Sequence, residues 1–185
     1  MVRIFSSSPH SNGDPNAMEK VKNQKTIIHP KGFTITWGND KRYWRLSRPS
    51  RDRKKDAIVA AELLQVSWLE VTCWTDNVEV GKSYKVGFNL SMTVGAFGWK
   101  GCEVYIMAKI GKAGKFVYKK VSLDTKCSDD QNKFNMPEDD LIITVKPPSS
   151  SPGDSRLYLG MYEVWSGRWK GGLKIHHAFI EKVGN

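Results

Sequence analysis

The sequence lacks long apolar runs, a leader-like N-terminus and the length of a large enzyme, and each shortage excludes a class of protein. No run approaches the roughly 18 apolar residues that a membrane span requires, so we expect a soluble protein with no membrane span. The opening residues, MVRIFSSSPHSNGDPN, contain no apolar stretch long enough for a signal peptide, which indicates a cytoplasmic protein. At 185 residues, the chain is too short for a large multidomain enzyme.

Cysteine is also scarce. The chain has three cysteines, and Cys73, Cys102 and Cys127 show no pair at metal-ligand spacing. We therefore expect free thiols in a reducing compartment rather than a disulfide framework or a zinc site. Adjacent His176 and His177 would point to opposite faces of a strand and cannot chelate one metal together. The sequence predicts no metal site and no cofactor.

Acidic residues are outnumbered by basic ones, 19 to 29, which gives a net charge of +10. Residues 41–56 hold eight basic side chains against Asp52 and Asp56, a net +6, so this short segment carries over half of the excess. Such a run is usually a solvated loop. Its functional alternative is contact with RNA or another anionic surface, because clustered Lys and Arg neutralise phosphates regardless of sequence.

The pattern from residue 33 onward is that of an all-β protein, with short apolar runs split by Gly, Pro, Asn and Asp. Apolar and polar residues alternate strictly from Ser83 to Met92, which predicts a strand with one face in the core. Cys102 to Ile110 alternates likewise, and a Gly-Lys-Ala-Gly turn predicts a hairpin with residues 115–123. Further strands are predicted at 33–36, 64–74, 141–145, 156–165 and 173–183. About eight strands fit an antiparallel, jelly-roll-like β-sandwich.

The first thirty residues differ from the rest. Residues 1–30 are rich in Ser, Asn, Pro and Lys and lack periodicity, which predicts a flexible, disordered or weakly ordered N-terminal tail. Residues 31–185 are expected to form one domain. Within it, residues 56–64 (DAIVAAELL) have the composition of a short helix and could equally lead straight into the next strand.

Large aromatics are abundant, with seven Trp, six Tyr and seven Phe. Segment 35–46 surrounds a Gly-Asn-Asp turn, where side chains tend to face solvent. Flat rings beside amide and carboxylate groups suit a sugar, because rings pack on the C–H face of a pyranose while polar groups bond its hydroxyls. The same rings are also consistent with a core or lid role. The candidate sugar contacts of this segment are Trp37, Asn39, Asp40, Tyr43 and Trp44.

Two more clusters are candidate binding sites. In an alternating strand, Glu163 would share a face with apolar neighbours, a costly placement unless backbone N–H groups or sugar hydroxyls bind the carboxylate. Trp169 and Lys170 follow in a glycine-containing loop and could flank the same pocket. Phe97 and Trp99 lie in a second glycine-rich loop, which is a weaker candidate for a site rim or a hairpin lid.

Four blocks of the sequence resemble, in order, those of plant phloem protein 2 and the Nictaba-type lectins. The blocks are FTITW at 33–37, RYWRL at 42–46, AELLQVSWLEV at 61–71 and EVWSGRWKGGL at 163–173. The resemblance implies a β-sandwich lectin that binds N-acetylglucosamine oligomers (chito-oligosaccharides) and N-glycan cores. It also implies a phloem-borne or nucleocytoplasmic location and, often, a homodimer.

The resemblance extends to site residues. The two Trp of the family's first block, which are implicated in sugar binding there, correspond to Trp37 and Trp44. The lysine-rich nuclear localisation stretch of some members is reduced to Lys119-Lys120, which leaves nuclear entry open. Asp40 and Glu163 are a conceivable carboxylate pair for glycoside hydrolysis. The resemblance implies binding without turnover, so no catalytic residue is predicted, and RNA binding through residues 41–56 is the alternative function.

Overall fold

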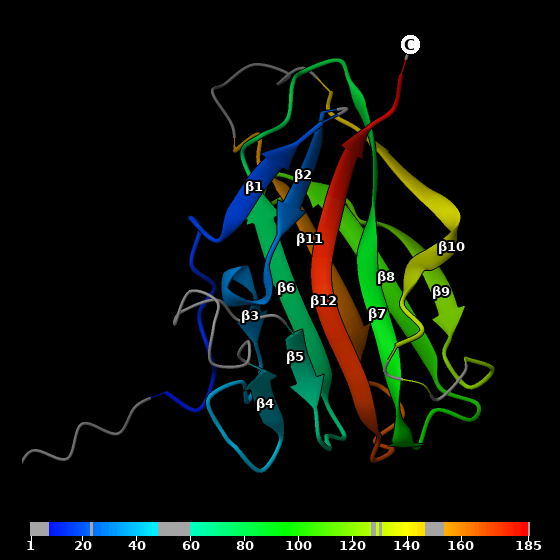
Figure 1. Ribbon diagram of the computed structural model, residues 1–185. Coiled ribbons are helices and arrows are strands. Elements are labelled where there is room, and N and C mark those ends of the chain that lie inside the picture. The colour runs from blue at the N-terminus through cyan, green and yellow to red at the C-terminus, as the bar shows by residue number, and fades with distance from the viewer. Residues whose placement is uncertain are drawn as a thin grey trace, which may run out of the picture.

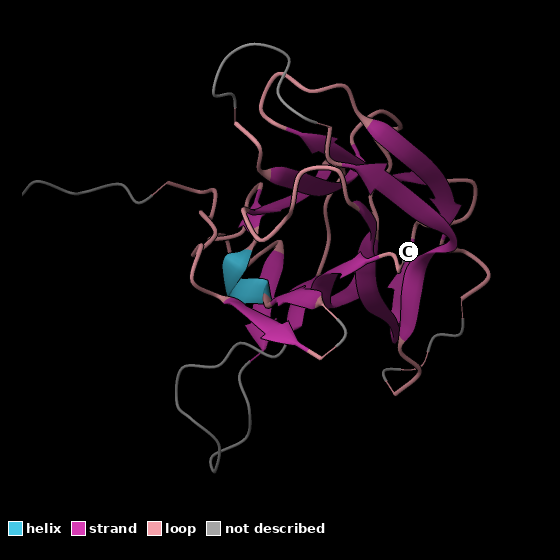
Figure 2. Ribbon diagram, turned by 90° about the horizontal axis from the view of Figure 1, so that it is seen from above, coloured by secondary structure: helices cyan, strands magenta, loops and turns pink. Residues whose placement is uncertain are grey.

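Two antiparallel sheets form the body of the protein. The computed structural model describes residues 8–22, 24–47, 60–126, 129, 131–146 and 154–184. In Figure 1 the larger sheet lies in front of the smaller one, and Figure 2 looks along the strands from above. One 3-10 turn, η1 (Pro30–Gly32), accompanies them. The predicted all-β, jelly-roll-like sandwich is confirmed. Among the described residues, no helix is long and apolar enough to cross a membrane.

The larger, seven-stranded sheet is organised around β12 (Gly171–Lys182). On one side, β12 pairs with β7 (Ser83–Phe97), which pairs in turn with β10 (Phe134–Thr144). On the other side, the two halves of β12 have different partners. The later half pairs with β2 (Lys25–Ile28), which is followed by β1 (Met18–Val21). The earlier half pairs with β5 (Ala60–Leu63), which is followed by β4 (Trp44–Ser47).

The second sheet has five strands in the order β3-β6-β11-β8-β9. These strands are β3 (Thr34–Ile35), β6 (Leu69–Thr75), β11 (Leu157–Glu163), β8 (Glu103–Ile110) and β9 (Val117–Ser122). In β6, Leu69, Val71 and Cys73 are buried while the residues between them are half-buried. The same alternation in β7, β8 and β11 fills the space between the sheets, which is why the period-2 pattern predicted these strands correctly.

One predicted strand is divided in two. Residues 64–74 were expected to form a single strand, but the structure has β5, a connection over residues 64–68, and then β6. Residues 60–63, for which a helix was an alternative, form β5 because they pair with β4 on one side and β12 on the other. Sheet pairing therefore outweighs the helix-forming composition of this segment. Residues 56–59 lie outside the described part.

The prediction of a weakly ordered tail over residues 1–30 is wrong for residues 8–22 and 24–30. β1 and β2 are part of the larger sheet, and Ile27 and Ile28 are buried. Upstream of β1, Ser11 forms an antiparallel bridge with Ile35 of the other sheet. The polar composition is explained by β1, a surface strand whose residues are half-buried or exposed. β2 has only four residues, Lys25–Ile28, and is too short to show a period in the sequence.

Docking of this N-terminal segment predicts a stability effect. Replacing Ile28, which is 1% exposed, with Ala should lower the free energy of unfolding by about 2–5 kcal/mol, because it removes packing and leaves a cavity. Val21→Ala in the neighbouring strand is the matched control, since Val21 is 38% exposed and should change stability by about 0.5 kcal/mol or less. Urea denaturation measures both. If both variants leave the free energy of unfolding nearly unchanged, β2 is not docked on β12.

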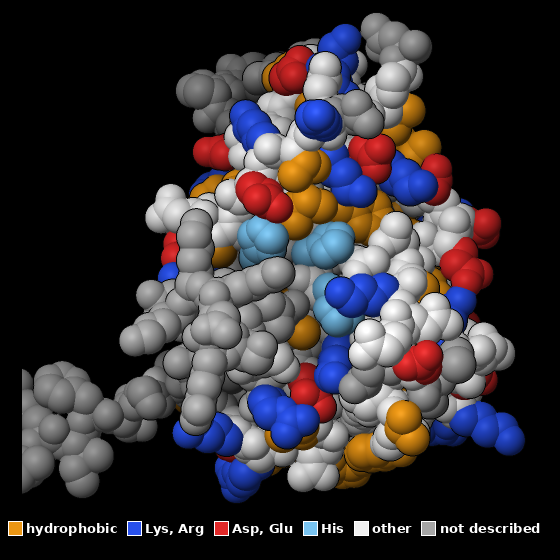
Figure 3. Space-filling model, in the orientation of Figure 1, with side chains coloured by type: hydrophobic (Ala, Val, Ile, Leu, Met, Phe, Trp, Pro, Cys, Tyr) orange, Lys and Arg blue, Asp and Glu red, His pale blue; other side chains and the backbone are white. Residues whose placement is uncertain are grey.

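The outer face of the larger sheet carries a group of histidines, visible in Figure 3. Burial is the main cause that lowers the pKa of His177 to about 4; interactions with Lys25, His29 and Lys133 contribute to the same shift, and Glu19 partly opposes it. The folded state therefore keeps His177 neutral at pH values where the unfolded chain, with an ordinary value of 6.5, is already protonated.

This difference predicts a pH dependence. The unfolded state binds more protons between pH 6.5 and about 4, so the free energy of unfolding should fall as the pH is lowered through that window. His177→Gln should flatten this part of the profile, because Gln does not titrate. Urea denaturation of both proteins at half-unit pH steps measures the effect. An identical slope in the two proteins would contradict the assignment.

Candidate functional site

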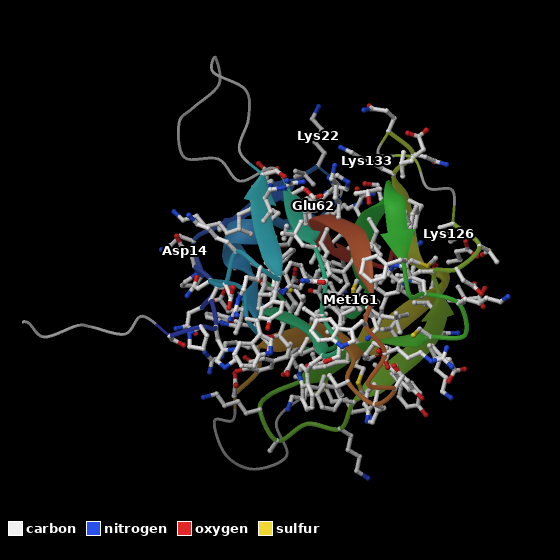
Figure 4. The ribbon with its side chains drawn as sticks, turned by 90° about the horizontal axis from the view of Figure 1, so that it is seen from below. Asp14, Lys22, Glu62, Lys126, Lys133 and Met161 are labelled. Carbon is white, nitrogen blue, oxygen red and sulfur yellow. The ribbon has the colours of Figure 1, made fainter. Side chains whose placement is uncertain are left out.

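Four loops meet at the lower end of the sandwich in Figure 1. They connect β3 to β4, β5 to β6, β7 to β8 and β11 to β12. Val66 and Lys170 exchange two backbone hydrogen bonds of 2.9 Å, which join the second loop to the fourth. Arg168 Nη1 donates to the carbonyl oxygen of Lys100 at 2.8 Å, which joins the fourth to the third. Figure 4 views the molecule from this end, and hydrophobic side chains show at the same edge in Figure 3.

An aromatic row crosses this end of the molecule and consists of His10, Trp37, Tyr43 and Trp169. The ring centroids of successive members are 5.0, 6.0 and 6.4 Å apart, so each ring contacts the next. Trp37 and Trp169 are 38% and 54% exposed. The row therefore brings together three of the predicted aromatic contacts, with Trp37 and Trp169 exposed and Tyr43 half-buried between them.

Trp37 is held in an unusual backbone conformation. Its φ of 64° lies in the left-handed region, which a bulky residue rarely adopts. The turn is fixed by hydrogen bonds from Gly38 N to Ile35 O and from Asp40 N to Trp37 O, both 3.0 Å. The Trp37 N–H itself donates to His10 Nδ1 at 3.0 Å. Strained residues of this kind concentrate at ligand-binding sites, where the surrounding contacts hold them in place.

Asn39 and Asp40 lie in the same turn and bind protein groups. The Asn39 side-chain amide donates to the carbonyl oxygens of Ser8 and His10, both at 2.9 Å, and so fastens the N-terminal segment beside Trp37. The Asp40 carboxylate accepts hydrogen bonds from the Arg42 side chain, the shortest 2.7 Å, and from its backbone N–H. The Arg42 guanidinium holds the pKa of Asp40 below its ordinary value. Both residues position the neighbouring rings.

Beneath the loops lies a buried ion pair between Glu163 and Lys170, which are 2% and 0% exposed. Burial alone would raise the pKa of Glu163, but hydrogen bonds from Lys170 and from the N–H and hydroxyl of Ser166 outweigh it and lower the pKa. Lys170 also donates to the carbonyl oxygen of Ser67 at 3.1 Å. The backbone N–H capture expected for Glu163 as a structural residue is present.

Two predicted aromatic contacts belong to the core instead. Trp44 is 2% exposed, because as the first residue of β4 it pairs with Leu63 and points to the same, inner face. Trp99 is 4% exposed, and its indole N–H donates to the carbonyl oxygen of Gly171 at 2.9 Å. The expectation that these two rings face solvent is wrong. Phe97, in contrast, is 45% exposed at the edge of the same end.

Sequence reasoning missed two aromatic side chains of this end. His10 contacts Trp37 but falls within the segment predicted to be a tail, and no local pattern marks it. Trp68 is 47% exposed, and its indole N–H donates to Glu70 at 2.8 Å. The alternation of Leu69, Val71 and Cys73 places residue 68 on the outward face, so this signal was present in the sequence.

The alternative functions can be compared with the structure. Of the basic segment 41–56, residues 48–56 lie outside the described part. Within the remainder, Arg42 is paired with Asp40 and Arg45 makes hydrogen bonds of 2.7–3.0 Å to Glu62. For glycoside hydrolysis, one carboxyl must have a raised pKa to act as the general acid. The pKa values of Asp40 and Glu163 are both lowered, so this pair does not fit that role.

These features define a β-sandwich protein that displays a row of rings on loops at one end. Comparison with known proteins specifies the family. The phloem protein 2 family model matches residues 23–181, so the chain belongs to the phloem protein 2 family.

Relatives agree with this assignment. The chain is 39% identical to Protein PHLOEM PROTEIN 2-LIKE A9 of Arabidopsis thaliana, over 95% of this chain and 97% of that protein. It is 33% identical to a lectin of Luffa acutangula over 40% of this chain and 35% of that protein. It is also 33% identical to a lectin of Coccinia grandis over 44% of this chain and 52% of that protein. The family resemblance in the four sequence blocks is thereby confirmed.

The buried ion pair generates a testable prediction. Glu163→Gln should lower the free energy of unfolding by about 3–5 kcal/mol, because it leaves the charge of Lys170 buried without a counter-ion. The loss should shrink as the pH falls below 4.5, since the pKa of Glu163 is lowered and its stabilising effect is complete only above its unfolded value. Chemical denaturation at pH 7 and pH 3.5 measures both effects.

Two controls accompany this variant. Glu163→Gln combined with Lys170→Met should be more stable than Glu163→Gln alone, because no unpaired charge remains. Glu103→Gln disrupts the solvent-exposed pair with Lys120 and should cost about 1 kcal/mol or less. If the buried and exposed variants lose the same stability, the pair does not organise the loop.

Proposed function

We propose that this protein is a carbohydrate-binding lectin that recognises N-acetylglucosamine oligomers through the aromatic row, without catalysis. The observation that carries the proposal is the contact series Trp37–Tyr43–Trp169, in which the half-buried Tyr43 connects two exposed rings from loops far apart in sequence. A monomeric protein has little reason to expose contiguous rings unless they bind a partner.

The chemistry of the row suits a sugar. Ring faces pack against the C–H groups of a pyranose and make no demand on charge. The Arg42 guanidinium lies 5.3 Å from the centre of the Tyr43 ring and supplies N–H donors for hydroxyl and acetamido oxygens at its edge. The row is open to solvent, so we expect single-site affinities in the micromolar to millimolar range, because little area is buried.

The family supports this proposal. The Luffa acutangula and Coccinia grandis relatives are named lectins. Specificity for chito-oligosaccharides and N-glycan cores, a homodimer, and a location in the phloem cytoplasm are implied by the resemblance and form part of the same proposal. A second site in a dimer would raise the apparent affinity through avidity.

The first test is Trp169→Ala, with Trp37→Ala as a second variant. Each change removes one ring of the row, and the affinity for chitotriose should fall about tenfold or more, which corresponds to about 1.4 kcal/mol. Isothermal titration calorimetry measures the affinity, and thermal unfolding of the same samples shows whether the fold is intact. Trp169 is 54% exposed, so its removal should leave the melting temperature nearly unchanged.

Trp44→Ala is the matched control, because it removes a buried indole and should cost about 3–5 kcal/mol of folding free energy. Sugar binding by the wild type should also be insensitive to salt, whereas binding to RNA through residues 41–56 would weaken steeply as salt rises. Wild-type affinity in both Trp169→Ala and Trp37→Ala would refute the aromatic row as the site. Salt-sensitive RNA binding without sugar binding would support the alternative function.

A further inference from the structure

A second aromatic surface lies on the outer face of the five-stranded sheet, away from the aromatic row. Tyr105 pairs directly with Tyr162 of β11, so the two side chains share the outward face. Tyr105 also contacts Tyr118 of β9 at 5.7 Å between ring centroids, and Trp165 of the fourth loop at 4.6 Å. Trp165 and Tyr118 are 61% and 53% exposed.

The surface continues toward the other edge of the sheet. Tyr162 pairs with Glu70 of β6, and Glu70 accepts the hydrogen bond from the indole N–H of Trp68. We call the set Trp68, Tyr105, Tyr118, Tyr162 and Trp165 the outer-face platform. It crosses from β6 to β9, three strand spacings of about 4.8 Å, and so extends over about 14 Å.

The sheet is shaped to present these rings. Gly160 precedes Tyr162 by two positions on the same outward face, and a methyl group at Gly160 would lie 2.4 Å from Cε2 of the Tyr162 ring. The ring therefore covers Gly160, where any side chain would displace it. The Tyr162 ring in the middle of the outer-face platform is therefore half-buried. The rings on either side, Trp68 at one edge and Tyr118 with Trp165 at the other, are more exposed.

Charge distinguishes this face from the rest of the chain. The charged residues at outward positions of β6, β8, β9 and β11 are two acids and two bases, Glu70, Glu103, Lys109 and Lys120. They sum to zero, whereas the chain carries +10. Lys120 lies 3.1 Å from Glu103 and 5.3 Å from the centre of the Tyr105 ring, so its charge is already neutralised. Such a face has no net positive charge to attract a polyanion, and it suits an uncharged ligand.

We propose that the outer-face platform is a second binding surface for an extended, uncharged polysaccharide chain that lies across the strands. Its rings contact successive sugar units, and the Tyr hydroxyls and the Glu70 carboxylate bond sugar hydroxyls. Because the platform spans about 14 Å, a long chain can contact Trp68 and Tyr118 together, so affinity rises with chain length. The outer-face platform and the aromatic row use different rings. They share only the loop between β11 and β12, which supplies Trp165 to the platform and Trp169 to the row.

The test uses the full chain and two soluble neutral polymers, glycol chitin and hydroxyethylcellulose, in affinity gel electrophoresis. The variant Trp165→Ala with Tyr118→Ala removes the two most exposed rings of the platform, and binding to at least one polymer should weaken at least tenfold. Its melting temperature should be nearly unchanged, and its affinity for chitotriose should remain within a factor of two of wild type. Ile142→Ala, a 47% exposed apolar residue of the other sheet, is the matched control and should leave polymer binding unchanged.

The outcomes separate the two proposals. If Trp169→Ala abolishes polymer binding while the double variant retains it, the outer-face platform is not a binding surface and the aromatic row stands. If the wild type binds polymer through Trp165 and Tyr118 but does not bind chitotriose, the aromatic row fails and the outer-face platform stands.

Three further results overturn the present proposal. The first is the absence of wild-type binding to either polymer, and the second is salt-sensitive binding of polyuridylate that depends on these rings in place of polymer binding. The third is a dimer that only the double variant disrupts while polymer binding is unchanged. The last is measured by sedimentation velocity. A fourth variant, Gly160→Ala, should displace the Tyr162 ring and weaken polymer binding without removing any aromatic group, which distinguishes a shaped surface from general ring content.

Discussion

The buried ion pair between Glu163 and Lys170 connects the end of β11 to the start of β12, and the loop between these residues carries both exposed tryptophans of this region. Glu163 also binds Ser166 within that loop, while Lys170 reaches the carbonyl oxygen of Ser67 in the neighbouring one. A charged side chain buried away from solvent is stable only when an opposite charge pairs with it. The pair therefore helps to fix both ends of the loop, together with the backbone hydrogen bonds between Val66 and Lys170, and this loop supplies Trp169 to the aromatic row and Trp165 to the outer-face platform.

The N-terminal segment acts as a second support at the same end. Asn39 binds the backbone of Ser8 and His10, and His10 accepts the hydrogen bond from the strained Trp37 N–H. The left-handed conformation of Trp37 costs energy that these contacts offset. A segment of unremarkable polar composition thus completes the surface on which the proposed function rests, and β1 and β2 fasten that segment to the larger sheet.

The fold could be predicted in outline because strands buried on one face repeat with a period of two. Ser83–Met92 and residues 102–110 show this period plainly and correspond to β7 and β8. The period is lost where strands are short, as in β2, or where pairing on both sides overrides composition, as in β5. For the site, the segment that carries most of the proposed contacts was singled out from the sequence, but its five aromatic and polar candidates could not be sorted into surface and core. Trp37 and Trp44 lie only seven residues apart and have opposite environments.

By itself, the sequence determined the all-β class, the family and most of the segments that carry the rings, because each of these is encoded in local alternation or in a run of consecutive residues. Only the tertiary structure decided which rings meet. Trp44 and Trp99 point inward because strand pairing sets the face of each residue, whereas Trp169 reaches Tyr43 because Val66 and Lys170 join two loops about a hundred residues apart. Contacts between segments so distant in the chain arise from backbone pairing and buried charge, and no local pattern records them.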